Sequence, residues 1–389
     1  MTKHLGGYGM TELLIKNCRY YQDHRFITGD LLFRDGKIAG DTDAGRNASV
    51  VDAEGRFLVP GFLDIHTHGG NNIDVNAASS RDIETIASFF ASHGTTGFQT
   101  SILTDTPEKT LECIGNVVAA QKESYDGAEI IGIHLEGPFL SPMYKGAMPE
   151  KLLRPADPAW LEACLKKGEG LVRYMTVAPE VEGVKDLIRN FAGRVTFALG
   201  HSGATYQDTM DCIALGAKAC THTFNGMRLF HQHEPAIMGA VLESDVYCEA
   251  ICDGRHLHPG SVRMLIKAKG LRRVVAITDS IQAAGLPDGH YHLGVNDVYV
   301  KDGDAKLADG TRAGSTLTMD KALQNLVAFT GLPMEKVLPL LTENPADLLG
   351  LSEKGRLNPG CDADAVMLDQ GLNVVRTYVH GREVYAAKK

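Results

Sequence analysis

Eight short apolar segments recur between residues 62 and 280, and this repetition limits the fold more than any other feature of the chain. Each is rich in branched or aromatic side chains, and most are followed by a longer amphipathic stretch. The segments are 62–68, 97–103, 130–137, 173–180, 195–202, 217–225, 247–254 and 272–280. Buried parallel strands alternating with helices have this pattern. Eight such units predict an α/β fold of the (β/α)8 TIM-like barrel type. The alternative fold is a doubly wound open sheet. This sequence lacks the G-x-G-x-x-G motif that such a fold is expected to have after its first strand.

The two ends of the chain have a different pattern from the middle. Residues 11–59 and 355–389 alternate short strands with turn signals, which predicts a small β-sandwich domain built from both termini. Helices around 318–350 are expected to cover the outside of the barrel. We therefore expect a flexible tail at 1–10, the β-sandwich domain at 11–59 and 355–389, and the barrel domain at 60–354.

Charge and hydropathy exclude several classes of partner. The formal net charge is −9 and the sequence has no basic run, so we do not expect nucleic-acid binding. No window approaches the ~18 consecutive apolar residues of a membrane span, and the N-terminus lacks the apolar core of a signal peptide. The eight cysteines include no C-x-x-C pair, as is usual for reduced thiols. We expect a cytoplasmic protein without membrane contact.

Polar side chains stand at the ends of most of these strands. They are His66 and His68, His134 and Glu136, His201, His222, Asp253, and Asp279. The C-terminal ends of barrel strands meet on one rim, so these side chains are expected to converge there. A His/Glu set suits zinc or another borderline divalent ion, and an open cluster without cysteine ligands indicates catalysis. Each residue alone also has a simpler interpretation, such as an N-cap for Asp279 or packing for His134.

Several strand-end motifs together resemble a known family. They are PGFLDIHTHG, HLEGPF at 134–139, GHSGAT at 200–205, THTFNGM at 221–227, ICDGRH at 251–256 and AITDS at 276–280. They resemble the amidohydrolase superfamily and, more closely, the N-acetylglucosamine-6-phosphate deacetylase family, over essentially the whole chain after residue 10. The resemblance implies a metal-dependent hydrolase of the acetamide of an N-acetyl amino sugar. The implied reaction converts N-acetylglucosamine 6-phosphate to glucosamine 6-phosphate and acetate.

The same resemblance implies the metal ligands. Glu136, His201 and His222 would bind one divalent ion, which the ligand types allow to be Zn, Fe or Mn. Members that keep the H-T-H motif use the equivalents of His66 and His68 for a second ion, with the glutamate bridging the two. Other members work with one ion, so one or two per subunit are possible here.

Catalytic and substrate-binding roles are implied as well. Asp279 would take the proton of a water molecule and return it to the leaving nitrogen. His256 would contact the substrate and help to polarise the acetyl carbonyl. The remaining implied substrate-binding positions are Asn225, Gly226, Ala147 and Ala313. Outside these motifs, His258, His290 and His292 are expected to be surface or loop residues.

Two positions depart from the family pattern. Met148 stands where relatives commonly have a histidine. His233 stands where they have an arginine that often reaches the substrate phosphate across a dimer interface. Histidine is a weaker phosphate ligand than the permanently charged arginine fork, and Arg228 or Arg312 would have to compensate. The resemblance implies a homodimer. The two departures predict that the 6-phosphate dependence is altered, with N-acetylgalactosamine 6-phosphate or an unphosphorylated N-acetylhexosamine as alternative substrates.

Two further interpretations stay open. A cyclic amidohydrolase usually bridges its metals with a carboxylated lysine, and no strand end of this chain offers one. A non-enzymatic sugar-binding protein is expected to have lost a ligand or the base, and this chain keeps all of them.

Overall fold

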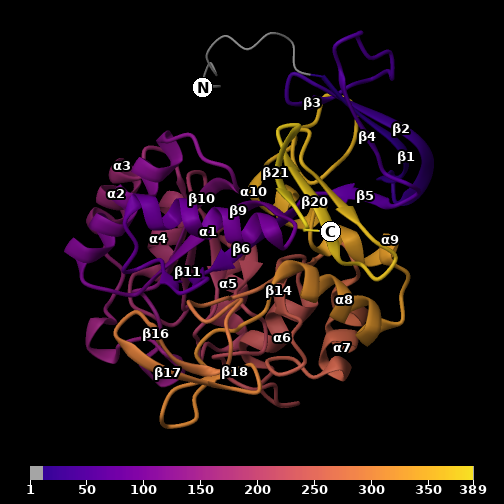
Figure 1. The fold of residues 1–389 in the computed structure, drawn as a ribbon. Coiled ribbons are helices and arrows are strands. Elements are labelled where there is room, and N and C mark those ends of the chain that lie inside the picture. The colour runs from indigo at the N-terminus through magenta and orange to yellow at the C-terminus, as the bar shows by residue number, and fades with distance from the viewer. Residues whose placement is uncertain (1–11, 389) are drawn as a thin grey trace.

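Eight parallel strands form the centre of the molecule and close into a barrel in the computed structural model, which describes residues 12–388 (Figure 1). The strands are β6 (Phe62–Thr67), β9 (Thr95–Leu103), β10 (Glu129–Glu136), β11 (Val172–Val177), β12 (Thr196–Leu199), β13 (Ala219–Cys220), β14 (Tyr247–Ile251) and β15 (Val274–Ile277). They pair in this order along the sheet. The ends of β15 and β6 are joined by hydrogen bonds from Asp279 N–H to the His66 carbonyl and from His68 N–H to the Ser280 carbonyl. The predicted (β/α)8 barrel is confirmed.

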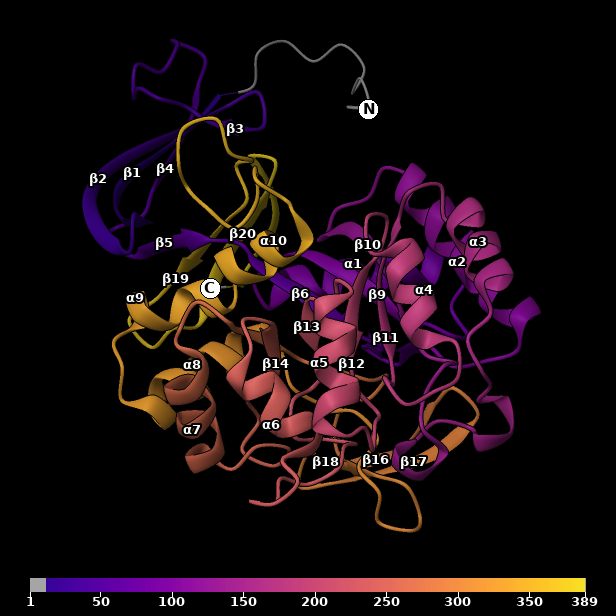
Figure 2. The ribbon, with the colours of Figure 1, turned by 180° about the vertical axis from the view of Figure 1, so that it is seen from behind.

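Helices pack around the strands, as both views show (Figures 1 and 2). They are α1 (Ser80–Ser92), α2 (Pro107–Lys122), α3 (Pro158–Lys167), α4 (Val184–Phe191), α5 (Tyr206–Ala214), α6 (Ala236–Glu243), α7 (Pro259–Lys269), α8 (Met319–Thr330), α9 (Met334–Val337) and α10 (Glu343–Leu349). Their starts are encoded locally: Thr106 and Asp157 cap α2 and α3, and a proline follows each cap, where its missing N–H costs nothing. Among residues 12–388, no helix combines the length and apolar character that crossing a bilayer requires.

A second sheet joins the two ends of the chain. Its strands are β1 (Glu12–Gln22), β2 (Arg25–Arg34), β3 (Lys37–Ile38), β4 (Ser49–Asp52), β5 (Phe57–Pro60), β19 (Ala365–Leu368), β20 (Val374–Val379) and β21 (Arg382–Ala386). Strand β5 pairs with β1 on one side and with β19 on the other, and the sheet curls around its own apolar core, which includes Phe33 and Tyr378. This fits the small sandwich expected from both termini. The division at residues 59 and 355 stays a prediction, and the expected tail at 1–10 lies outside the described residues.

The chain passes from this sheet into the barrel at Gly61, between β5 and β6. A Cβ atom at this position would lie 2.0 Å from the Thr96 hydroxyl. Only glycine therefore permits this segment to approach β9 so closely.

The sequence analysis did not predict a three-stranded antiparallel sheet that follows β15. It consists of β16 (Gly289–Leu293), β17 (Asn296–Lys301) and β18 (Asp304–Lys306). His290 and His292 are exposed, as expected, but they lie on a strand. A short hairpin of β7 (Gly69–Gly70) and β8 (Ile73–Asp74), and the 3-10 turns Pro142–Tyr144, Glu150–Leu152 and Leu338–Leu340, complete the described elements.

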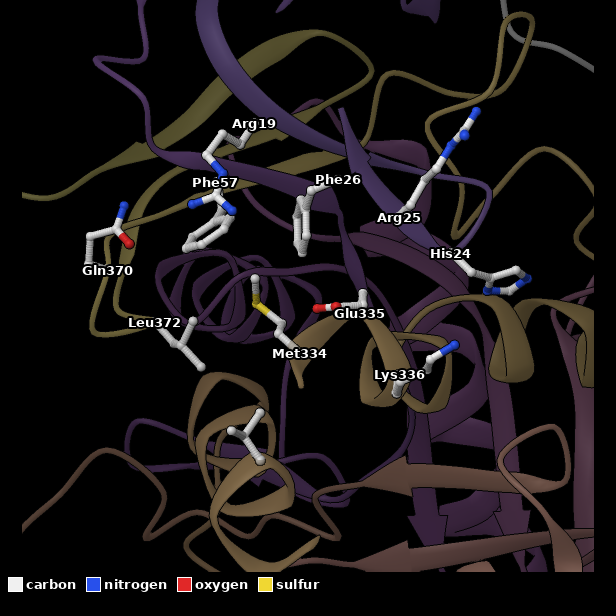
Figure 3. A pocket seen from close by; sticks show the side chains of 11 residues that line it. Arg19, His24, Arg25, Phe26, Phe57, Met334, Glu335, Lys336, Gln370 and Leu372 are labelled. Carbon is white, nitrogen blue, oxygen red and sulfur yellow. The ribbon is translucent and has the colours of Figure 1, made fainter. Parts of the chain in front are cut away.

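A hollow of about 600 Å³ lies where the terminal sheet meets α8 and α9 (Figure 3). The Arg19 guanidinium lies over the Phe57 ring, 4.4 Å from its centroid, and Met334 and Leu372 complete much of the apolar lining. None of the strand-end histidines or carboxylates lines this hollow. It is a feature of the junction between the terminal sheet and helices α8 and α9, and not of the predicted site.

A buried lysine connects the barrel to the terminal sheet. The Lys354 ammonium is only 9% exposed, and it lies 2.5 Å from Glu129 of β10 and 2.9 Å from both Asp362 and Asp364, which precede β19. Burial opposes the charge of Lys354, but the three carboxylates keep its pKa well above the usual value. Removing one partner from such a cluster leaves uncompensated buried charge.

Replacing Lys354 with methionine is therefore expected to lower the free energy of unfolding by about 3–5 kcal/mol, measured by urea denaturation. Lys37→Met is the control. Lys37 also contacts Asp362, but its side chain is 39% exposed, so a loss below about 1 kcal/mol is expected. Equal denaturation midpoints for the two variants would contradict the interpretation.

Low pH is expected to lower the free energy of unfolding through the same contacts between the barrel and the terminal sheet. Burial opposes ionisation of Glu129, but the His380 hydrogen bond and the Lys354 charge outweigh it and lower the pKa to about 2. A carboxyl group with a depressed pKa stabilises the fold above its unfolded pKa. This contribution is therefore lost as the pH falls from roughly 4 towards 2. Lys354→Met is expected to flatten that part of the stability–pH profile.

Candidate metal centre

The C-terminal ends of the barrel strands place the predicted ligands at one rim. Glu136 ends β10, while His201, His222 and Asp279 each stand two positions after the last residue of their strands. Six residues meet here, each 7% exposed or less: His66, His68, Glu136, His201, His222 and Asp279. The C-terminal rim is where barrels of this type place their chemistry.

Three of these positions have an unusual backbone conformation. The φ angles are +47° at His201, +26° at His222 and +49° at Asp279. Residues with a side chain rarely adopt positive φ values, because the Cβ atom is crowded there. Such backbone strain is concentrated at functional sites, where the surrounding structure enforces it.

The Glu136 carboxylate lies at the centre of the cluster. Its Oε1 atom is 3.1 Å from His201 Nε2 and 3.2 Å from His222 Nε2, and its Oε2 atom is 3.0 Å from His68 Nε2. His66 Nε2 lies 3.6 Å from Oε1. Two groups of three potential metal ligands therefore share Glu136: one with His201 and His222, the other with His66 and His68.

In two of these histidines, the Nδ1 nitrogen faces a backbone carbonyl. His68 Nδ1 lies 3.1 Å from the Ser101 carbonyl, and His201 Nδ1 lies 2.8 Å from the Tyr144 carbonyl. A carbonyl oxygen only accepts, so Nδ1 carries the hydrogen and the Nε2 lone pair faces the centre. Metal-binding histidines have this orientation.

The donor set fits a divalent cation. The Nε2 atoms of His201 and His222 lie 3.0 Å apart, and those of His66 and His68 lie 3.3 Å apart. Two lone pairs this close repel each other unless a proton or a metal ion lies between them. Imidazole nitrogen and carboxylate oxygen are ligands that zinc and similar ions accept.

The buried charges also shift the titration of the cluster. Burial opposes protonation of His66 and His68, but Asp279 and Glu136 outweigh it. The pKa of His66 lies well above its usual value, and that of His68 rises to about 9. Burial likewise opposes ionisation of Glu136 and Asp279, but His66 and the neighbouring imidazoles lower the pKa of both. Both carboxylates are therefore ionised at neutral pH.

Glu249 of β14, which contacts two of the predicted ligands, was not identified in the sequence analysis. Its side chain is fully buried. It accepts a hydrogen bond of 2.7 Å from the Tyr174 hydroxyl and one of 3.0 Å from the His222 backbone N–H, and it lies 3.0 Å from His66 Nδ1. A carboxylate of this kind orients the imidazole and raises its basicity. The available signal was a single acidic residue inside the apolar segment YCEAI.

His134 lies beside the ligands and has other partners. Its Nδ1 and Nε2 atoms are each 2.8 Å from a hydroxyl, of Ser101 and Thr176 respectively. Burial and the neighbouring His66 charge hold its pKa well below the usual value. Its ring packs edge-on against His66, so the geometry supports the packing interpretation.

The predicted catalytic histidine is held by a neighbouring carboxylate. His256 Nδ1 lies 2.7 Å from Asp253 Oδ2, and the His256 backbone N–H donates to Oδ1 of the same side chain. Burial opposes ionisation of Asp253, but the His256 hydrogen bond and charge lower its pKa. Asp253 thereby fixes the ring, and Nε2 is the nitrogen that remains for other contacts.

Several predicted substrate-binding positions lie close to the ligands. A Cβ atom at Gly226, where φ is +58°, would lie 3.1 Å from His201 Nδ1. Asn225 is held by His222, whose carbonyl accepts hydrogen bonds from its backbone and its side chain. Ala313 is buried and precedes Ser315, whose N–H donates to the Asp279 carbonyl. Ala147 lies beside Gly146, where a Cβ atom would meet His201 at 3.1 Å.

The two departures from the family pattern lie in different surroundings. Met148 is buried in an apolar cluster that also contains Ala313. His233 is exposed in a loop, where its ring lies 5.3 Å from that of His231. Arg312 is engaged by Asp304, with its Nε atom 2.9 Å from the carboxylate.

Comparisons with known proteins identify the family. The sequence profile of the amidohydrolase family matches residues 57–384. The chain is 34% identical to the N-acetylglucosamine-6-phosphate deacetylase of Bacillus subtilis, over 97% of this chain and 98% of that protein. It is also 34% identical to the N-acetylgalactosamine-6-phosphate deacetylase of Escherichia coli O157:H7, over 86% of this chain and 89% of the relative.

A solved structure agrees. The N-acetyl-D-glucosamine-6-phosphate deacetylase of Mycobacterium smegmatis, a mutant in complex with N-acetyl-D-glucosamine-6-phosphate, superimposes with a TM-score of 0.88 at 32% identity, covering 97% of this chain and all of that chain. The barrel, the terminal sheet and the full-length similarity agree with one another. The chain belongs to the amidohydrolase family and, within it, to the N-acetylglucosamine-6-phosphate deacetylases.

Proposed function

We propose that this chain is a metal-dependent deacetylase that hydrolyses the acetamide of N-acetylglucosamine 6-phosphate to glucosamine 6-phosphate and acetate. The observation that carries the proposal is the Glu136 carboxylate with imidazole nitrogens at 3.0 to 3.6 Å and the ionised Asp279 beside them. The names of the similar proteins support the substrate class. The direct test is acetate release from this substrate, abolished by a chelator and restored by Zn²⁺, Mn²⁺ or Fe²⁺.

Glu136, His201 and His222 are proposed to hold one divalent ion. His66 and His68 are proposed to hold a second, with Glu136 shared between them. When bound here, such an ion lowers the pKa of a water molecule and polarises a carbonyl oxygen. The ligand types suit Zn, Fe and Mn alike.

Asp279 is the proposed general base and acid. Its Oδ1 atom lies 3.3 Å from His68 Nε2, and its backbone N–H is fixed by the His66 carbonyl. An ionised carboxylate held at this position can accept a proton from the attacking water. It then returns the proton to the nitrogen as the C–N bond breaks.

His256 is proposed to contact the acetyl group through Nε2, with Asp253 holding the ring. Asn225, Gly226, Ala147 and Ala313 are proposed to line the sugar end of the pocket. Their closeness to His201, His222 and the carbonyl of Asp279 supports this assignment.

A homodimer is proposed to bring His233 to the substrate of a neighbouring subunit. The loop that contains His233 also exposes Leu229, at 74%, and Phe230, at 56%. Two exposed apolar side chains in one loop favour a protein contact.

The alternative substrates are N-acetylgalactosamine 6-phosphate and unphosphorylated N-acetylhexosamines. His233 supports this alternative, because an arginine at this position would supply a permanent charge to a phosphate. Met148 supports it as well, because an apolar thioether replaces a ring that forms hydrogen bonds.

Replacing Asp279 with asparagine is expected to lower kcat by about 10²- to 10⁴-fold, the usual contribution of a general acid–base group. Asparagine has the same size but cannot take up the proton. Metal content, measured by mass spectrometry, is expected to stay at the wild-type value. Unchanged turnover in a fully metal-loaded variant would remove Asp279 from the mechanism.

Glu249→Gln is expected to weaken metal binding by about 10- to 100-fold. The neutral amide is a weaker acceptor for the hydrogen on His66 Nδ1 than the carboxylate is, so it supports the His66 ligand less well. The affinity is measured by competition with a chromogenic chelator. Tyr174→Phe is the matched control: it removes the hydrogen bond to the other Glu249 oxygen and leaves the carboxylate in place, so a smaller change is expected. Wild-type affinity in Glu249→Gln would show that this contact does not support the ion.

His233→Arg is expected to raise kcat/KM for N-acetylglucosamine 6-phosphate about tenfold or more, because a hydrogen bond to a charged group contributes about 1.5–3 kcal/mol. Activity on N-acetylglucosamine itself is expected to change little. Gln232→Arg, one position away, controls for added surface charge. If the wild-type protein already strongly prefers the 6-phosphorylated gluco sugar and His233→Arg adds nothing, the altered-specificity hypothesis is wrong.

A further inference from the structure

The sheet formed by β16, β17 and β18 has two different faces. Leu293, Val298 and Val300 are buried on its inner face, where they join the apolar cluster of Met148 and Ala313. His290, His292, Asp297 and Tyr299 alternate with these residues and are exposed. The sheet lies at the end of the molecule opposite the terminal strands (Figures 1 and 2). Its outer face is not part of the centre around Glu136.

Three potential metal ligands meet on this outer face. His290 and His292 stand at i and i+2 of β16, so both point to the same side. His292 pairs directly with Asp297 of β17. Asp297 Oδ1 lies 2.8 Å from His290 Nε2 and 3.5 Å from His292 Nδ1.

The backbone that carries these ligands is well held. Strands β16 and β17 are joined by a tight turn at residues 294–295, and Tyr299 stacks on the His290 ring at 5.0 Å. The turn is anchored to the barrel rim, because the Gly294 N–H donates to Asp74 and the Asn296 amide donates to the Ala147 carbonyl. Little backbone ordering is therefore required when a ligand binds.

We propose that His290, His292 and Asp297 form a surface site for a divalent transition-metal ion, separate from the centre around Glu136. Ligand atoms ~2.1 Å from an ion in a tetrahedral site lie roughly 3.4 Å from each other, close to the spacings that this face provides. Two imidazoles and one carboxylate suit Cu²⁺, Ni²⁺ and Zn²⁺, with Cu²⁺ bound most tightly. Water completes the coordination because all three side chains are exposed.

The other H-x-H pairs outside the barrel centre do not offer the same arrangement. His256 is committed to Asp253, and His258 Nδ1 accepts the Gly260 N–H at the start of α7. His231 and His233 face each other, but within residues 12–388 no third His, Cys, Asp or Glu ligand joins them. This last pair is therefore a matched control.

Copper titration of the full-length protein tests the proposal. The protein is first loaded with Zn²⁺, freed of excess metal, and then titrated with Cu²⁺ while the bound zinc is counted by mass spectrometry. We expect one additional Cu²⁺ per chain without loss of zinc, and an electron paramagnetic resonance spectrum with coupling to two nitrogens. The His290→Ala/His292→Ala double variant is expected to lose this signal, and Asp297→Asn to bind at least tenfold more weakly.

The controls separate this site from the proposed catalytic centre. His231→Ala/His233→Ala is expected to keep the copper stoichiometry and spectrum, and circular dichroism checks that every variant is folded. The zinc that stays bound to the His290→Ala/His292→Ala variant after excess metal is removed is expected to match wild type, because the exposed three-ligand site binds Zn²⁺ more weakly than Cu²⁺. This expectation holds whether or not the protein proves to be a deacetylase. The proposal is overturned if this variant binds copper with the wild-type stoichiometry and spectrum, or if copper enters only by displacing zinc.

Discussion

The hydrogen bonds that join the end of β15 to the end of β6 close the barrel, and the geometry of the metal centre depends on this closure. They tie Asp279 N–H to the His66 carbonyl and His68 N–H to the Ser280 carbonyl, so residues more than 200 positions apart become neighbours. The same closure brings the Asp279 carboxylate to 3.3 Å from His68 Nε2. An open sheet would leave the proposed base and the first pair of ligands at opposite edges.

The second constraint is electrostatic. Two carboxylates and four imidazoles are buried together at the rim, and taking charged groups out of water is costly unless they are paired. Without a cation, the carboxylates draw protons onto the cluster, as the raised pKa of His66 and His68 shows. A divalent ion would satisfy the same carboxylates and leave the imidazoles neutral. The buried carboxylates therefore favour the binding of a cation at this site.

The barrel and the convergence of polar strand-end side chains could be predicted from simple periodicity, whereas the roles of these side chains were implied by the family resemblance. Strand ends of a parallel barrel must meet, so polar residues at these ends could be grouped before any coordinates were known. Glu249 was missed because it lies inside β14 and acts through its buried contacts with His66 and His222. The positive φ angles of His201, His222 and Asp279 depend on tertiary structure and leave no local signal. The β16–β18 sheet was missed because its histidines, outside any family motif, were interpreted as isolated surface residues.

The most direct test of the central claim is anomalous diffraction at the metal absorption edge, on crystals of protein loaded with Zn²⁺. One or two strong peaks are expected beside Glu136, each within about 2.3 Å of its carboxylate and of two histidine nitrogens. A first peak between His201 and His222 would establish the centre, and a second between His66 and His68 would establish the pair. Well-ordered crystals with no peak at Glu136, or with zinc bound only elsewhere, would contradict the account.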